Sequence, residues 1–281
     1  MTRHGRHRDP TFLSSMYGYD ADGEIDGAGW AVSAQDGDLR PISSLVVSAG
    51  DGVGATGRLK RVAGGLRLAA VGAGLYDIVV EQAAPSVPLT LESAPAGVDV
   101  VTVEGVWRDG GITEARIVPF REPVRFPDAL GDRAEPPLVA GGRTTRAEVL
   151  AVDVMAVVDG LRESGLVSYV AHCDERGWFG VASATDPEPV RRGLRRVLGD
   201  SFLVVHSPWG LQTLDAIDRI FESDGVGRGT LHIGRFIDPR GRLRSSALVR
   251  FVSPALARAL GDTGASAVDL AAWIIPSSPD I

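Results

Sequence analysis

Cysteine and lysine are almost absent from this chain of 281 residues, which has one of each, Cys173 and Lys60, beside 28 arginines. A single cysteine cannot form a disulfide within the chain, and low cysteine content is typical of proteins in a reducing compartment. We therefore expect a cytoplasmic location. The use of arginine in place of lysine is typical of a GC-rich coding sequence, so the arginines by themselves do not indicate an anion-binding protein.

Long apolar segments are also absent. No segment approaches the roughly 20 apolar residues that a membrane-spanning helix needs. The basic start of the chain is not followed by the apolar core of a secretory signal, so we expect neither a membrane span nor a signal peptide. The composition, 44% hydrophobic and 23% charged, is typical of a folded protein. The net charge of −7 argues against nucleic-acid binding over the whole surface.

Most motifs that mark cofactor or catalytic sites are missing. The strings GxxxxGK followed by Ser or Thr, HExxH and GxSxG do not occur. One GxGxxG string, formed by Gly52, Gly54 and Gly57, precedes a predicted strand, whereas a dinucleotide site needs a helix there. The alternating acids of residues 20–26 lack the glycine and the final glutamate of a calcium loop. We therefore predict no cofactor and no metal.

The first part of the chain is predicted to be all β. Residues 1–10 form a basic tail that we expect to be mobile, and residues 11–120 alternate short apolar segments with turn residues about every ten positions. The clearest hairpin follows the alternation of residues 101–107 and turns at 109–111, the sequence Asp-Gly-Gly. This pattern predicts a β-barrel or sandwich. Residues 121–144 contain four prolines and are predicted to be an extended linker.

The second part of the chain shows the same order of elements twice. Residues 145–208 and 209–276 each read helix–strand–turn–strand–helix–strand, and the turns at 174–177 and 238–241 share the pattern Asp-x-Arg-Gly. The first repeat opens with a capping box, Thr145 with Glu148, followed by one largely apolar helix that we expect to be buried. We predict an α+β protein whose C-terminal part is a duplicated αββαβ domain with pseudo-twofold symmetry.

Two parts of the sequence resemble known families. The closing hairpin, VTVEGVWRDGGITEARIVP, resembles the last hairpin of OB-type small barrels. The duplicated unit is similar in element order to BON-type domains and to the pro-domains of alpha-lytic-type proteases. The second resemblance implies a non-enzymatic role, such as binding a polypeptide or a membrane-associated partner, or acting as a chaperone.

An arginine-rich hairpin is the leading candidate for a binding site. Arg242, Arg244 and Arg250 share one parity of a predicted strand and apolar residues share the other, while Arg235 lies on the preceding strand. One face is therefore predicted to be cationic and could dock a protein partner, with Trp209 as a possible anchor. This reading makes the protein a non-enzymatic scaffold with no catalytic residues. The alternatives for the arginines are a solvated sheet face or a charged edge. Trp209 and Trp273 could instead pack over the strand ends.

Two alternative functions use other residues. An OB-like nucleic-acid surface would use Arg58, Lys60, Arg61 and Trp107. A hydrolase or transferase would use Cys173 as nucleophile and His206 as base, although a small buried core cysteine is the alternative reading of Cys173. Three strand histidines could hold a metal ion only if their strands were adjacent, namely His172, His206 and His232.

Overall fold

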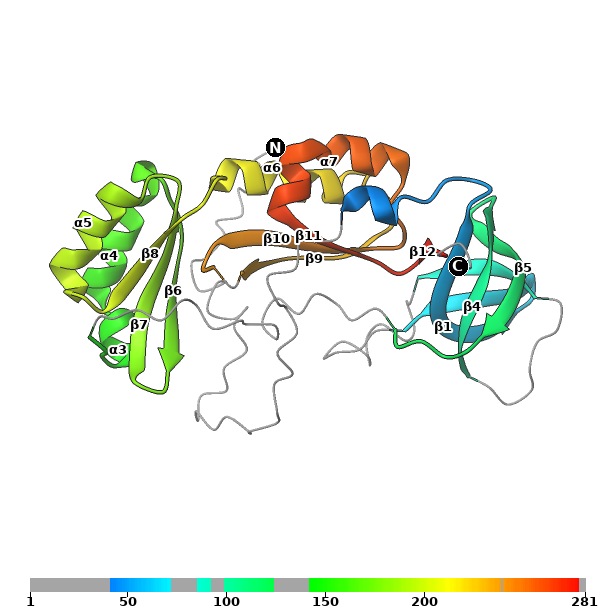
Figure 1. Ribbon diagram of the computed structural model, residues 1–281, viewed down its shortest axis with the longest axis horizontal. Coiled ribbons are helices and arrows are strands. Elements are labelled where there is room, and N and C mark those ends of the chain that lie inside the picture. The colour runs from blue at the N-terminus through cyan, green and yellow to red at the C-terminus, as the bar shows by residue number, and fades with distance from the viewer. Residues whose placement is uncertain (1–40, 72–84, 92–98, 124–141, 239, 278–281) are drawn as a thin grey trace, which may run out of the picture.

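The computed structural model describes residues 41–71, 85–91, 99–123, 142–238 and 240–277. The predicted tail at 1–10, the acidic run at 20–26 and most of the predicted linker lie outside the described residues. The fold is α+β, as predicted, with helices and several sheets. Figure 1 shows three units in a row: an αββαβ unit at one end, a second αββαβ unit in the middle, and a β unit at the other end.

Strands make up most of the described residues between 52 and 118, while residues 11–40 of the predicted all-β part lie outside the described residues. The strands of the β unit are β1 (Gly52–Val62), β2 (Gly65–Ala70), β3 (Ser86–Leu91), β4 (Val100–Arg108) and β5 (Gly111–Val118). They form one sheet with β12 (Ile275–Pro276) in the order β12-β1-β2-β3-β5-β4, in which β1 also pairs with β4 and β3 runs parallel to β5. Alternate apolar side chains of these strands point inward to form the core of the unit.

The predicted closing hairpin is β4–β5. Its turn places Asp109 at φ 51° and Gly110 at φ 75°, so two consecutive residues have the left-handed backbone that two-residue hairpin turns require. The three glycines of the GxGxxG string lie within β1, and no helix follows them. They are therefore part of a strand and do not form a dinucleotide loop.

The first αββαβ unit contains the elements predicted for residues 145–208, except for its opening helix. That helix is two short ones, α3 (Arg146–Val149) and α4 (Val152–Gly160), followed by a short 3₁₀ helix, η2 (Arg162–Ser164). Where the first helix ends, the carbonyl of Val149 accepts a hydrogen bond from the Tyr169 hydroxyl at 2.9 Å, in place of one from an amide one turn later. The predicted capping box of α3 is present, but the expected burial is only partial, since Val152 is 88% exposed.

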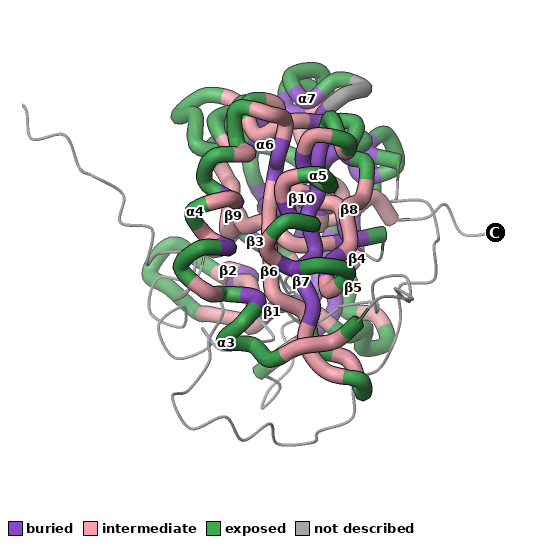
Figure 2. The backbone as a smooth tube through the Cα atoms, turned by 90° about the vertical axis from the view of Figure 1, so that its left-hand side faces the viewer, coloured by how far each residue is buried: buried purple, intermediate pink, exposed green. Residues whose placement is uncertain are grey.

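The two αββαβ units have the same strand pairing. In the first, β6 (Leu166–Asp174) is antiparallel to β7 (Gly177–Ala184), and β8 (Phe202–His206) returns through α5 (Pro187–Leu198) to lie parallel to β7. In the second, which opens with α6 (Leu211–Glu222), β9 (Thr230–Ile237) is antiparallel to β10 (Leu243–Val249), and β11 (Val268–Ala272) returns through α7 (Pro254–Ala267) to lie parallel to β10. The middle strands β7 and β10 are the most buried (Figure 2).

Packing crosses the predicted domain boundaries at both ends of the described chain. The apolar start of residues 45–50, LVVSAG, predicts a strand, but Leu45 instead ends a 3₁₀ helix, η1 (Ile42–Leu45). Ile42 and Leu45 belong to the core of the second αββαβ unit. The following residues lie between the two cores, because Val46 forms a bridge to Val252 while Val47 packs in the core of the β unit. Conversely, β12 pairs with β1.

Two tryptophans join the units. Trp209 follows β8, packs in the core of the second αββαβ unit, and donates its indole N–H to the Leu243 carbonyl at 2.5 Å. Trp273 follows β11, packs in the core of the β unit, and donates to the Thr56 carbonyl at 2.8 Å. Each repeat thus ends in an aromatic side chain buried in the next unit. This burial, with Trp209 only 5% exposed, leaves little of Trp209 for the anchoring of a partner that the sequence suggested.

Candidate functional site

The turn of the β9–β10 hairpin is organised around one buried carboxylate, that of Asp238, whose side chain is 3% exposed. Its Oδ1 accepts hydrogen bonds from the backbone N–H groups of Arg240 and Arg242, both at 2.9 Å. Its Oδ2 lies 2.6 Å from the Arg242 guanidinium and 3.1 Å from Nε of Arg244. The corresponding turn of the first unit has the same local bond, because Asp174 accepts from the backbone N–H of Arg176 at 2.9 Å. Both turns are therefore Asx turns.

The Trp209 ring fixes the same two guanidinium groups from another side. The guanidinium carbons of Arg242 and Arg244 lie 5.6 and 5.2 Å from the centre of that ring. Their side chains are only 19% and 13% exposed. Burial lowers the pKa of Arg244, and the negative charge of Asp238 opposes that shift. The two groups are thus held rigidly, because a carboxylate and an aromatic face both restrict them.

Arg235 does not belong to this group, which corrects the predicted single cationic face. Its guanidinium donates to Asp215 and to Asp218 (2.7 Å) on α6, and Asp218 also accepts from the Ser245 hydroxyl at 2.8 Å. Burial alone would lower the pKa of Arg235, but these two carboxylates outweigh it and raise the pKa. Arg235 therefore faces α6 and fastens the helix to the sheet, on the side away from Arg244.

The hairpin turn also touches the first αββαβ unit. A Cβ at Gly241 would stand 3.2 Å from Val205 and 3.3 Å from Val181, which lie on β8 and β7. The backbone N–H of Leu243 donates to the buried hydroxyl of Ser183 at 3.3 Å. The arginine group therefore sits where the sheet of the first unit meets the hairpin of the second.

The residues of the nucleic-acid alternative are only partly available. Arg58 lies 3.0 Å from Asp99, and Trp107 is buried in the core of the β unit against Phe251, with ring centres 4.9 Å apart. Trp107 therefore cannot stack on a base, which corrects its proposed role. Lys60 and Arg61 lie near the end of β1, where Arg61 is exposed.

The enzyme alternative is wrong in its geometry. Cys173 pairs across the sheet with Trp178, while His206 pairs with Ala184, six residues further along β7. At 3.3 Å per residue the two side chains are about 20 Å apart, far beyond proton-transfer distance. The alternative reading of Cys173 as a buried core residue is also wrong, since its thiol is free and exposed at the edge strand β6. Cys173 is exposed because it lies near the hairpin end of β6, which is an edge strand.

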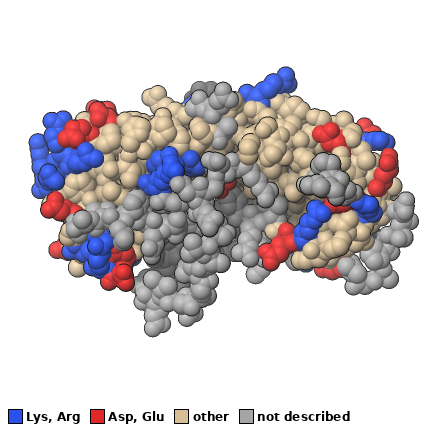
Figure 3. Space-filling model, viewed as in Figure 1, with Lys and Arg blue, Asp and Glu red and all other residues tan. Residues whose placement is uncertain are grey.

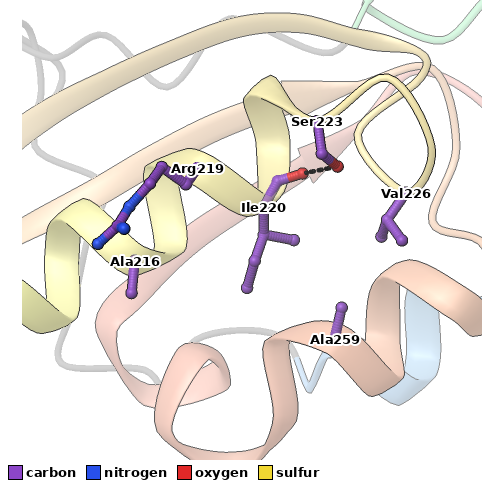
Figure 4. Close-up of a pocket in the computed structure, with 6 residues that line it drawn as sticks. All are labelled: Ala216, Arg219, Ile220, Ser223, Val226 and Ala259. Carbon is purple, nitrogen blue, oxygen red and sulfur yellow. Dashed lines mark hydrogen bonds between the residues drawn. The ribbon is translucent and has the colours of Figure 1, made fainter.

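The residues that the structure describes contain no cluster of potential metal ligands. His172 and His206 lie on opposite edge strands of one sheet, His232 lies in another sheet, and no three potential ligands come together among the described residues. A hollow of about 350 Å³ lies between α6 and α7. Figure 4 shows the residues that line it. Its lining is mostly apolar, and its one charged group, Arg219, donates to the carbonyl of Asp215. The lining residues are Ala216, Arg219, Ile220, Ser223, Val226 and Ala259.

Sequence reasoning missed a second basic surface, on α5. The helix buries Val190, Leu194 and Leu198, which forces the arginines between them outward. Basic side chains gather over this end of the molecule in Figure 3, with acidic ones beside them. The apolar spacing in VRRGLRRVL was the signal that could have revealed it. The exposed arginines of this surface are Arg191, Arg192, Arg195 and Arg196.

Comparison with known proteins gives no relative for this chain. No family model matches it, and the searches of curated proteins and of solved structures find no significant match. Within the described residues, no helix is long and apolar enough to cross a membrane.

Proposed function

We propose that this protein is a non-enzymatic binding protein, located in the cytoplasm, that engages an acidic surface of a protein partner through the tip of the β9–β10 hairpin. The observation that supports this proposal is the rigid arginine group around Asp238. The tip is defined by Arg240, Arg242 and Arg244. The cytoplasmic location rests on the single cysteine.

Charge and rigidity make this tip suited to an acidic partner. The carboxylates that act on Arg244 are those of Asp238 and Asp269, so three guanidinium groups face two negative charges. One positive charge remains in excess. Because Asp238 and Trp209 already restrict Arg242 and Arg244, a partner carboxylate would immobilise little side-chain freedom on binding. Guanidinium groups also offer further donors for bidentate pairing with carboxylates.

We propose in addition that the two αββαβ units are copies of one ancestral unit related by pseudo-twofold symmetry. Identical strand pairing, the matching Asx turns at Asp174 and Asp238, and the matching joints at Trp209 and Trp273 support a duplication. For the β unit we propose an OB-like small barrel. Its support is the strand order, with β1 paired to both β2 and β4 and with β3 parallel to β5.

The test compares two charge reversals at equal net charge. Arg240→Glu changes the tip but keeps the backbone N–H that Asp238 accepts, whereas Arg192→Glu changes an exposed arginine of α5. Purified wild-type and variant proteins would be used as bait, and captured proteins quantified by mass spectrometry after cross-linking. We expect Arg240→Glu to reduce capture of an acidic protein at least tenfold, with no change for Arg192→Glu. Equal capture by Arg240→Glu, or loss with Arg192→Glu instead, contradicts the tip as the binding surface.

A second candidate function is nucleic-acid binding by the β unit. The OB-like strand order and the exposed Arg61 beside Lys60 favour it. Titration with a labelled single strand at two salt concentrations tests it, because phosphate contacts weaken steeply as salt rises. Binding that is absent, or that Arg61→Glu leaves unchanged, excludes this surface.

A further inference from the structure

Three arginines meet where the second αββαβ unit joins the β unit. Arg250 follows β10, and its backbone N–H donates to the carbonyl of Gly229 at 2.7 Å, which places it beside Arg228. The next residue, Phe251, packs against Trp107 of the β unit. Arg67 comes from β2 of the β unit, where Nε and a terminal nitrogen donate to the hydroxyl (2.8 Å) and carbonyl (2.7 Å) of Ser86.

These arginines differ from those around Asp238 and α6 in lacking carboxylate partners. Over the described ranges, Arg235, Arg242 and Arg244 have acidic partners, but no ion pair is found for Arg67, Arg228 or Arg250. Burial lowers the pKa of Arg250, and the positive charges of Arg67 and then Arg228 lower it further. The charges of Arg67 and Arg228 are therefore each close enough to Arg250 to repel it.

Arg250 also has an unused donor. Its Nε is shielded from solvent and has no hydrogen-bond partner in the described structure. A buried N–H without an acceptor is costly and uncommon, and a bound water, ion or ligand can supply the missing acceptor. Repulsion between like charges and an unsatisfied donor at the same guanidinium both call for an anion.

We propose that Arg67, Arg228 and Arg250 form a binding site for a phosphate group at the junction between the β unit and the second αββαβ unit. Three guanidinium groups suit a doubly charged tetrahedral anion better than a single carboxylate, because each presents paired donors and together they exceed the charge of one carboxylate. Asp238 lies before the first residue of β10, and Arg250 follows its last residue. At the rise of about 3.3 Å per strand residue, the two sites are roughly 20 Å apart. The phosphate site is therefore separate from the hairpin tip, and either proposal can fail alone.

Calorimetric titration with inorganic phosphate tests the site, at constant ionic strength set with sodium chloride. The Arg250→Met variant removes the guanidinium and keeps an unbranched side chain. Arg258→Met is the matched control, because Arg258 is an exposed arginine on α7. We expect saturable binding to the wild type and to the control, and at least tenfold weaker binding to Arg250→Met. A parallel titration with glycerol phosphate shows whether the site accepts free phosphate, a phosphate monoester or both. Failure of the wild type to bind either one, or equal binding by Arg250→Met, overturns the proposal.

Thermal unfolding separates a ligand site from a structural role of Arg250. Without phosphate, Arg250→Met should melt at the same temperature as the wild type or higher, because the change removes repulsion and an unsatisfied donor. Phosphate should raise the melting temperature of the wild type and of Arg258→Met but not that of Arg250→Met, since a ligand stabilises only the state that binds it. A lower melting temperature of Arg250→Met in phosphate-free buffer would show that the guanidinium serves packing, and it overturns the proposal.

Discussion

Replacing Asp238 with asparagine removes the negative charge at the centre of the hairpin turn while changing almost no volume. The amide oxygen can still accept from the backbone N–H groups of Arg240 and Arg242, so the turn itself is retained. The guanidinium groups of Arg242 and Arg244, however, lose the charge that compensates their burial. The experiment thus isolates the contribution of charge from that of turn geometry.

The expected loss follows from how far these groups are buried. Removing one partner of a buried ion pair costs about 3–5 kcal/mol. Since Arg242 and Arg244 keep 19% and 13% of their side chains exposed, water screens part of the charge. We therefore expect the free energy of unfolding to fall by about 2–3 kcal/mol.

Urea unfolding followed by circular dichroism measures this loss. With a denaturant dependence of about 2–3 kcal/mol per molar urea, the midpoint should fall by about 1 M. Asp200→Asn is the control, because Asp200 is largely exposed and only 3.6 Å from Arg195. It should change stability by less than about 0.5 kcal/mol. If Asp238→Asn shifts the midpoint no more than Asp200→Asn does, the carboxylate does not hold the arginine group and the reasoning on the tip is refuted.

Three further predictions test other parts of the structure. Trp273→Phe removes the donor to the Thr56 carbonyl and should lower the stability of the β unit by about 1–3 kcal/mol; calorimetry would show it as an earlier transition, and an unchanged profile would contradict the role of Trp273 as a joint. Hydrogen bonds from Thr144, and then from Thr145, lower the pKa of Glu148 from 4.5 to about 2, so its stabilising effect is complete above about pH 5 and is lost as the pH falls towards 2. Glu148→Gln should therefore flatten the acid side of a stability–pH curve between these values, and a curve parallel to that of the wild type would count against the cap. The exposed thiol of Cys173 should react with a disulfide reagent in the native protein at a rate near that of the unfolded chain, and protection would show that it is covered.

Local patterns in the sequence were sufficient for most of the secondary structure. The β4–β5 hairpin was predictable because its turn needs two left-handed residues, which Asp109 and Gly110 adopt readily. The start of α3 was predictable because Thr145 and Glu148 bond reciprocally within one turn. The order of elements in both αββαβ units follows in the same way from periodicity and turn residues.

Contacts between distant segments decided the departures from those patterns. The carbonyl of Val149, where the first helix ends, accepts from the hydroxyl of Tyr169 on β6, and Leu45 lies in a 3₁₀ helix packed on a core formed elsewhere and not in the predicted strand. Sequence parity correctly placed Arg244 on one face of β10, but it could not show that Asp238 and Trp209 cover it.

The amino-acid sequence by itself thus determined the class of the protein and the two occurrences of the αββαβ order, because side-chain periodicity, helix caps and turn residues act between positions a few residues apart. Tertiary structure alone decided which arginines are neutralised, that Cys173 is about 20 Å from His206, and that each terminal tryptophan lies in the next unit. Those outcomes depend on which surfaces meet after folding, and charge compensation and burial act through space and not along the chain.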